Sequence, residues 1–303
     1  MLELLMTHKL DVSPNNQELI VTNDVGQPIT IAVNWCRGIG TRSNLIYILD
    51  VPTGVTTAKV NLYSYDTITN VWVDLGLTTT GLSRLNYSPT LTAVNQNLLV
   101  YMALDLVYFY DIPSNVWTLK KVIGTGQSGY MHGAKGWLYG GNIYRYGTWV
   151  DSLGNRDIAV MSYDTSTDKH TGVFSDSRHN AVSNYYAPTI LVGTKLYYFA
   201  MVGIVSYYDF ALGRIIYTTE TVPVAAYNTL VEYNGNILIF GDASGGSNVR
   251  LFNTTTNTVT LLTNKAIADT TRTFGFIDTS NIPNVYVAKR VDPDVCNFLK
   301  YSM

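Results

Sequence analysis

The chain has 303 residues, close to the upper size of a single hydrophobic core, so one large domain or two small ones are expected. Its apolar fraction of 47 % is ordinary, but Asp, Glu, Lys and Arg make up only 14 %, against about 25 % in a typical soluble domain. This composition excludes a disordered chain, which needs high charge, and disfavours long exposed helices, which depend on Glu, Lys and Arg. With 23 tyrosines and a net charge of −2, the chain is predicted to be all-β and not to bind nucleic acid.

Neither the N-terminal residues nor the most apolar stretch has the features of a targeting or membrane segment. The run from Met1 to Met6 contains Glu3 and has no basic start, so no secretory signal is predicted. Residues 196–208 carry no charge, but this stretch is shorter than the roughly 20 residues that a spanning helix needs. We therefore expect no membrane insertion.

An internal repeat dominates the sequence. Six times the chain runs through an aromatic-led segment, a short apolar strand and a second strand that ends in Tyr or Phe. The steps between these strand ends are 45, 53, 45, 44 and 49 residues, and the ends are Tyr65, Tyr110, Tyr163, Tyr208, Phe252 and Tyr301. A period in the forties with several short strands is typical of propeller blades. The sequence thus predicts a six-bladed β-propeller over residues 24–303.

A turn of constant type follows the terminal aromatic in five repeats. Asp or Asn comes directly after the aromatic, and Asn, Asp or Gly stands four residues later, as in Tyr65-Asp66 through Asn70. The first side chain can accept hydrogen bonds from the following backbone N–H groups, and the last residue tolerates the left-handed conformation that closes the hairpin. The preceding strand is predicted at residues 44–47, 97–100, 136–139, 195–198, 236–239 and 284–287.

The C-terminus leaves the last predicted blade incomplete. Tyr301 ends its third strand, and only Ser302 and Met303 follow. Because an unpaired sheet edge is a liability, we expect residues 1–23 to form an arm whose strand completes that blade and closes the ring. Two segments are candidates for this strand, 8–12 and 18–21.

These repeats resemble the Kelch family of β-propellers. Two repeats carry a Tyr followed by a Trp after six intervening residues, namely Tyr65 with Trp72 and Tyr110 with Trp117. The family's diglycine appears once, as Gly140-Gly141, and His170 stands where another repeat would have its Trp. The resemblance implies the propeller fold for residues 30–301. It also raises the activities of Kelch-like copper oxidases and sugar epimerases as alternatives to a binding role.

The most regular candidate binding surface is the aromatic that leads each repeat. These residues are Trp35, Tyr87, Tyr130, Tyr186, Tyr227 and Phe274. At the mouth of the central channel they could stack on sugars or anchor a partner's side chain. The alternative is that each ring wedges against the neighbouring blade, which the recurrence in every repeat favours.

Other candidate sites are weaker. Residues 124–129 match a dinucleotide fingerprint, but a strand instead of a helix is expected to follow, so this segment is interpreted as a loop. Neither the histidines nor the cysteines have metal-ligand spacing, and no metal or cofactor is expected. Arg37, Arg42 and Arg272 could clamp a sugar carboxylate or simply bridge blades. Cys36 and Cys296 become neighbours on ring closure, either as a disulfide or as free thiols.

No catalytic residue is therefore assigned, and the chain is interpreted as a non-enzymatic propeller with a structural or recognition role. A weakly charged exterior is typical of proteins exposed outside cells, yet no secretion signal is found. A virus or phage component such as a tail, fibre or decoration protein fits both facts. Its expected partners are other proteins of the assembly or a carbohydrate receptor. The alternative is a Kelch-like epimerase or oxidase with its site at the propeller axis.

Overall fold

The computed structural model is all-β, with 27 strands and no helix among the residues it describes. Those residues are 20–24, 39–42, 44–50, 56–69, 71–83, 90–103, 106–120, 129–132, 135–151, 153, 155–176, 187–200, 203–222, 229–241, 248–263, 275–277, 284–292 and 295–302. In the strands before residue 44, in β12 and from residue 263 onward, only the backbone is described. Within this part of the chain, no helix is long and apolar enough to cross a membrane.

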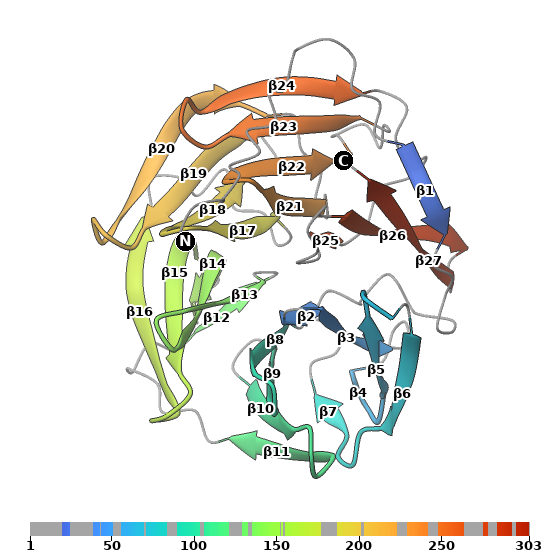
Figure 1. The fold of residues 1–303 in the computed structure, drawn as a ribbon. Helices are drawn as coiled ribbons and strands as arrows, with labels where there is room; N and C mark the ends of the chain where they lie inside the picture. The colour runs from blue at the N-terminus through green and yellow to red at the C-terminus, as the bar shows by residue number, and fades with distance from the viewer. Residues whose placement is uncertain are drawn as a thin grey trace, which may run out of the picture.

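The strands form twisted antiparallel sheets arranged as a propeller around a common axis (Figure 1). Four sheets follow the chain outward from the axis without a crossover. The first contains β2 (Ile39–Arg42), β3 (Leu45–Asp50), β5 (Asn61–Asp66) and β6 (Val71–Leu77). The second contains β8 (Thr90–Asn95), β9 (Leu98–Ala103), β10 (Leu106–Asp111) and β11 (Val116–Lys120).

The other two of these four sheets lie in the second half of the chain. One contains β17 (Thr189–Val192), β18 (Lys195–Phe199), β19 (Ile204–Asp209) and β20 (Arg214–Thr221). The next contains β21 (Thr229–Tyr233), β22 (Asn236–Phe240), β23 (Val249–Asn253) and β24 (Thr258–Thr263). A separate two-stranded ribbon pairs β4 (Thr57–Ala58) with β7 (Leu82–Ser83).

The N-terminal strand completes the C-terminal sheet, as predicted. β25 (Gly275–Ile277), β26 (Asn284–Asp292) and β27 (Val295–Ser302) run outward in chain order. β1 (Ile20–Asp24) then pairs antiparallel with β27 from the outside, with Val21 opposite Tyr301. Of the two candidate segments, 18–21 overlaps this strand, whereas 8–12 lies outside the described residues.

One sheet departs from the predicted alignment. It contains β12 (Gly129–His132), β13 (Gly136–Tyr139), β14 (Asn142–Asp151), β15 (Arg156–Asp164) and β16 (Lys169–Asp176). Residues 136–139 were predicted to be the second strand, but β13 is an innermost strand beside β14. Gly140 and Gly141 have φ of 55° and 85°, the positive values that a two-residue hairpin turn needs. The diglycine therefore precedes the second strand instead of following it.

The five predicted turns are confirmed at their first position. The Asp66, Asp164 and Asp209 carboxylates each accept a hydrogen bond from the backbone N–H two residues later, at 2.8, 2.8 and 2.9 Å. Asn253 does the same from Thr255 at 2.9 Å, and Asp111 accepts from the Ser114 N–H at 3.1 Å. These bonds satisfy donors that the hairpin would otherwise leave without a protein partner.

The closing position of the turns is also confirmed wherever it is described. Asn115, Asp168, Gly213 and Asn257 have φ of 54°, 54°, 62° and 56°, and Asn70 lies outside the described residues. In two turns the terminal tyrosine hydroxyl donates to this residue, from Tyr110 to Asn115 at 3.1 Å and from Tyr163 to Asp168 at 2.8 Å. The aromatic and the turn that follows it are thus one structural unit.

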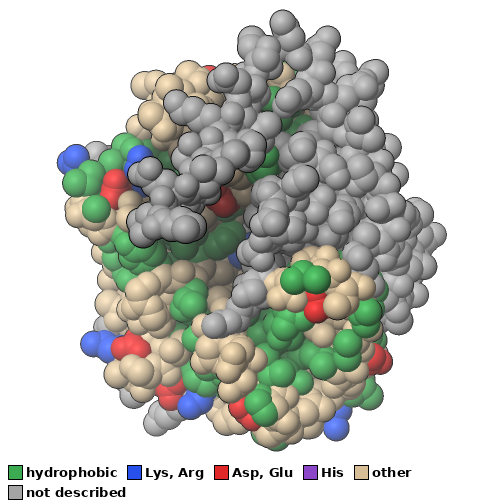
Figure 2. All heavy atoms as spheres, viewed as in Figure 1, with side chains coloured by type: hydrophobic (Ala, Val, Ile, Leu, Met, Phe, Trp, Pro, Cys, Tyr) green, Lys and Arg blue, Asp and Glu red, His purple; other side chains and the backbone are tan. Residues whose placement is uncertain are grey.

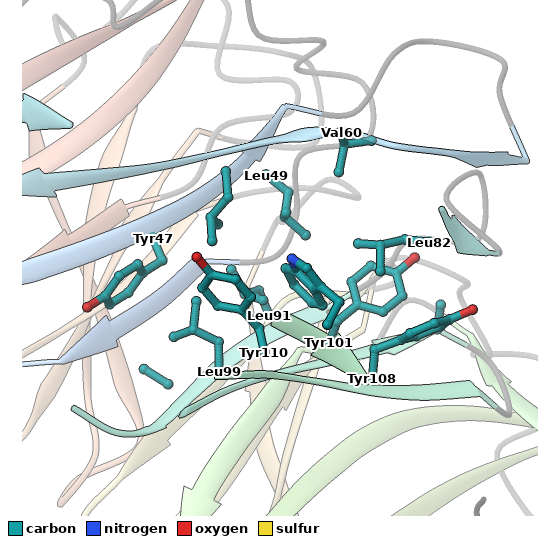
Figure 3. Packing of buried hydrophobic residues seen from close by; sticks show 13 residues of the cluster. Tyr47, Leu49, Val60, Leu82, Leu91, Leu99, Tyr101, Tyr108 and Tyr110 are labelled. Atoms are coloured by element: carbon teal, nitrogen blue, oxygen red, sulfur yellow. The ribbon is translucent and has the colours of Figure 1, made fainter. Parts of the chain in front are cut away.

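The hydrophobic core lies between successive sheets. The largest cluster among the described residues joins β3 and β5 of one sheet to β8, β9 and β10 of the next, with Tyr47 and Leu49 opposite Leu91 and Leu99 (Figure 3). Tyr101 crosses this interface, and its hydroxyl donates to the Ser83 carbonyl at 2.9 Å. Because each sheet is sandwiched by two others, both faces of its inner strands are buried.

The outermost strands are protected against edge-to-edge pairing. In five sheets the outermost strand follows its neighbour in the chain, and in four of these the register of that outer pair is interrupted by a β-bulge or irregularity, as between Asn61 and Tyr63 or between Ile204 and Ser206. The pairing of β1 with β27 is interrupted in the same way. The pair β10 and β11 has no such interruption. There the Trp117 N–H donates to Thr79 Oγ1 at 3.2 Å, so a side chain from the segment after β6 covers the edge.

Candidate interaction surface

The predicted aromatic ring falls almost wholly outside the described residues. Trp35, Tyr87, Tyr186, Tyr227 and Phe274 are not described, and neither is the side chain of Tyr130. The backbone of Tyr130 lies in β12, an innermost strand, opposite Val150. A binding role for the ring stays a prediction.

Several other sequence candidates can be placed. Gly129 begins strand β12, so a strand and not a helix follows the glycine-rich segment, as expected. Arg42 ends β2, and Cys296 lies in β27, but their side chains are not described; Cys36, Arg37 and Arg272 lie outside the described residues. In the described part of the chain, no group of three or more His, Cys, Asp or Glu side chains could hold a metal ion.

His170 packs in place of a tryptophan, as predicted. Its ring lies 5.2 Å from the ring of Tyr163, its cross-strand partner. The matching pairs Tyr65–Trp72 and Tyr110–Trp117 have ring centroids 4.5 and 4.7 Å apart. Burial, aided by the positive charge of Arg145, lowers the pKa of His170 to about 4. A neutral, aromatic histidine is therefore part of the packing between sheets.

Large apolar side chains are exposed on two neighbouring outer strands. On β6 and the turn before it, Ile68, Val71, Val73 and Leu77 are between 46 and 71 % exposed. On β11, Val116 and Leu119 are 45 and 53 % exposed. We call these six residues the outer apolar surface. Figure 2 shows apolar side chains gathered over the part of the molecule that these two sheets occupy.

The two strands of the outer apolar surface are held beside one another. Asn115 Nδ2 donates to the Leu75 carbonyl at 3.4 Å, and the bond from Trp117 to Thr79 joins the same segments. Trp72 and Trp117 stack on the terminal tyrosines of their own sheets. Val71 and Val73 lie on the other face of β6, which they share with Leu75 at the border of the core cluster between the two sheets, and Leu119 lies on the same face of β11 as Trp117. The surface is thus the peripheral part of the two outer strands, beyond the core between their sheets.

Outward positions on other outer strands are more polar. β20 carries Arg214 and Glu220, and β16 carries Lys169. β6 has one charged residue, Asp74, whose carboxylate accepts a hydrogen bond from the Gly76 N–H at 2.7 Å. Among the described residues, the remaining exposed large apolar side chains lie apart from this surface, at Leu153, Leu212 and Leu261. No motif in the sequence marks the residues of the outer apolar surface, although the low charge fraction is a signal for such a surface.

Comparison with known proteins adds no relative. No protein-family model matches the chain, and no curated protein matches it.

Proposed function

We propose that the protein is a six-bladed propeller of Kelch type that acts as a non-enzymatic structural or interaction component, as a tail, fibre or decoration part of a virus or phage particle. The blade count rests on treating the sheet β12–β16 as a blade with an interrupted inner strand. β12 and β13 pair with successive parts of the same strand, since His132 faces Thr148 and Gly136 faces Arg145. The Tyr–Trp pairs support the Kelch type.

The observation that carries the proposed function is the outer apolar surface. A monomeric protein rarely gathers uncovered Val, Leu and Ile on adjacent strands, because such patches promote association. The six side chains are exposed, and none of them is a member of the core clusters found among the described residues. A second protein of an assembly would bury them, and a weakly charged exterior avoids the cost of burying charges at such a contact.

The test is incorporation into particles. The chain and a Val71→Lys/Val73→Lys variant are expressed in cells that assemble the particles, and particles are purified by density gradient and assayed by mass spectrometry. We expect the original chain in the particles and at least tenfold less of the variant. Thr258→Lys/Thr260→Lys, which adds the same two charges at exposed sites of β24, is the control and should incorporate normally. Absence of the original chain, or equal incorporation of a folded double variant, contradicts the proposal.

A further inference from the structure

Lys135 occupies a distinctive place beside the propeller axis. It directly precedes β13, one of the innermost strands (Figure 1). Its Nζ lies 4.2 Å from the centre of the Trp137 ring, two residues further along the same face. The Trp137 indole N–H donates to Thr189 Oγ1 at 3.1 Å, and Thr189 begins β17, the innermost strand of the next sheet. The amine therefore lies in the wedge between two inner strands.

The backbone that carries Lys135 is fixed from the other side as well. A Cβ on Gly136 would lie 2.5 Å from Thr92 Oγ1 and 3.0 Å from Ile143 Cγ2, so only glycine permits this approach. Thr92 Oγ1 also donates to the Gly136 carbonyl at 3.2 Å. β13 is thus held between β8 on one side and β17 on the other, and Lys135 is positioned before any ligand arrives.

The charge of Lys135 is not balanced within the described residues. For comparison, Lys120 forms an ion pair with Asp168 at 3.7 Å. Among the described residues, Lys135 has no such carboxylate partner, and its amine instead contacts the Trp137 ring. Burial lowers the pKa of Lys135 to about 8, which leaves the amine mostly protonated at neutral pH. As a whole residue, Lys135 is nevertheless partly exposed to solvent, so a small solute can reach it.

We propose that Lys135 binds the oxyanion of a small molecule, a carboxylate or a phosphate, at the propeller axis. A desolvated ammonium gains more from an anion than an exposed one does, because the surrounding protein screens the attraction less than water. The Trp137 ring stabilises the cation on one side and leaves its remaining N–H donors for the ligand. This site lies on inner strands and is independent of the outer apolar surface.

The test uses inorganic phosphate and acetate as separate probes. The melting temperature of the full chain is measured at pH 7 with each anion, against chloride at equal ionic strength. We expect a saturable rise with phosphate, acetate or both, and the responding probe identifies the class of oxyanion. Lys135→Met should weaken the apparent affinity at least tenfold.

Lys195→Met is the matched control, because Lys195 also lies over an aromatic ring, 4.7 Å from the centre of Tyr207, but at the start of β18. It should respond to the anions as the original chain does. Lys135→Gln is a second neutral variant in case Lys135→Met fails to fold. No saturable response of the original chain to either anion, or an unchanged response in a folded neutral Lys135 variant, would overturn the proposal.

Discussion

The innermost and outermost strands contain similar apolar residues, but these residues are buried in the inner strands and exposed in the outer ones. Leu91 in β8 is fully buried and Ile190 in β17 is 2 % exposed, whereas Val73 in β6 and Leu261 in β24 are 46 and 55 % exposed. Inner strands have a sheet on either side, while the outward side chains of the last strand have none. Stability should therefore depend on inner residues, and outward apolar residues should be free to serve association.

The largest effect is expected from removing the strand that completes the C-terminal sheet. Deleting residues 1–24 exposes the edge of β27 and removes its pairing with β1. We expect loss of the cooperative unfolding transition, since a domain of this kind is stable by only about 5–15 kcal/mol. Circular dichroism melting measures it. Deleting 1–19 keeps β1 and serves as the control; unchanged melting of the longer deletion contradicts the closing role.

A second experiment sets an inner residue against an outer one. Leu91→Ala leaves a cavity between two sheets and should cost about 2–5 kcal/mol of unfolding free energy. Val73→Ala should change it by no more than about 0.5 kcal/mol, because Val73 is 46 % exposed and is not a member of the core cluster. Urea denaturation of both variants gives these values. Equal losses would mean that the outer apolar surface is part of the core.

The third prediction concerns pH and the packing of His170. Its pKa falls from 6.5 to about 4 on folding, so the unfolded chain takes up a proton at higher pH than the folded one. The stabilising contribution is present above pH 6.5 and is lost as pH falls through 4, by up to about 3 kcal/mol. His170→Trp, which copies Trp72 and Trp117, should lose less stability between pH 7 and pH 4. Parallel pH profiles in urea denaturation would refute a neutral buried histidine.

Among the substitutions expected to destabilise the fold, those in the turns should have the smallest effect. Asp209 accepts hydrogen bonds from the Ala211 and Leu212 N–H groups at 2.9 and 3.2 Å. Asp209→Ala should therefore cost about 1 kcal/mol in urea denaturation. Asp209→Asn retains an acceptor, as Asn253 does in its own turn, and should recover most of the loss. If both substitutions cost the same, the turn depends on charge and not on hydrogen bonding.

The repeat was readable from the sequence because its turns are local. Asp66 and Asn253 bond to residues two positions away, so spacing alone locates them. The strand that ends near Tyr301 would otherwise be an unpaired sheet edge, and this likewise predicted that an N-terminal strand pairs with it. The predicted repeat alignment was wrong at Gly140-Gly141. An apolar tetrapeptide next to two glycines can form either the first or the second strand of a blade, and only the observed strand pairing distinguishes the two positions.

The candidate sites were much less predictable. The outer apolar surface depends on which part of β6 and β11 extends beyond the core between their sheets, and that is decided by packing between residues far apart in sequence. In the sequence, nothing distinguishes Lys135 from other lysines. Its position depends on the contacts of the adjacent strand β13 with β8 and β17. Both features arise from contacts between sheets and carry no local motif.

The most direct measurement is hydroxyl-radical footprinting of the chain, free and within purified particles. We predict that residues 68–77 and 116–119 become protected in the particle, while Leu261 on β24 keeps its reactivity. Equal reactivity of 68–77 in the two states would contradict the assignment of the outer apolar surface as the contact with the assembly.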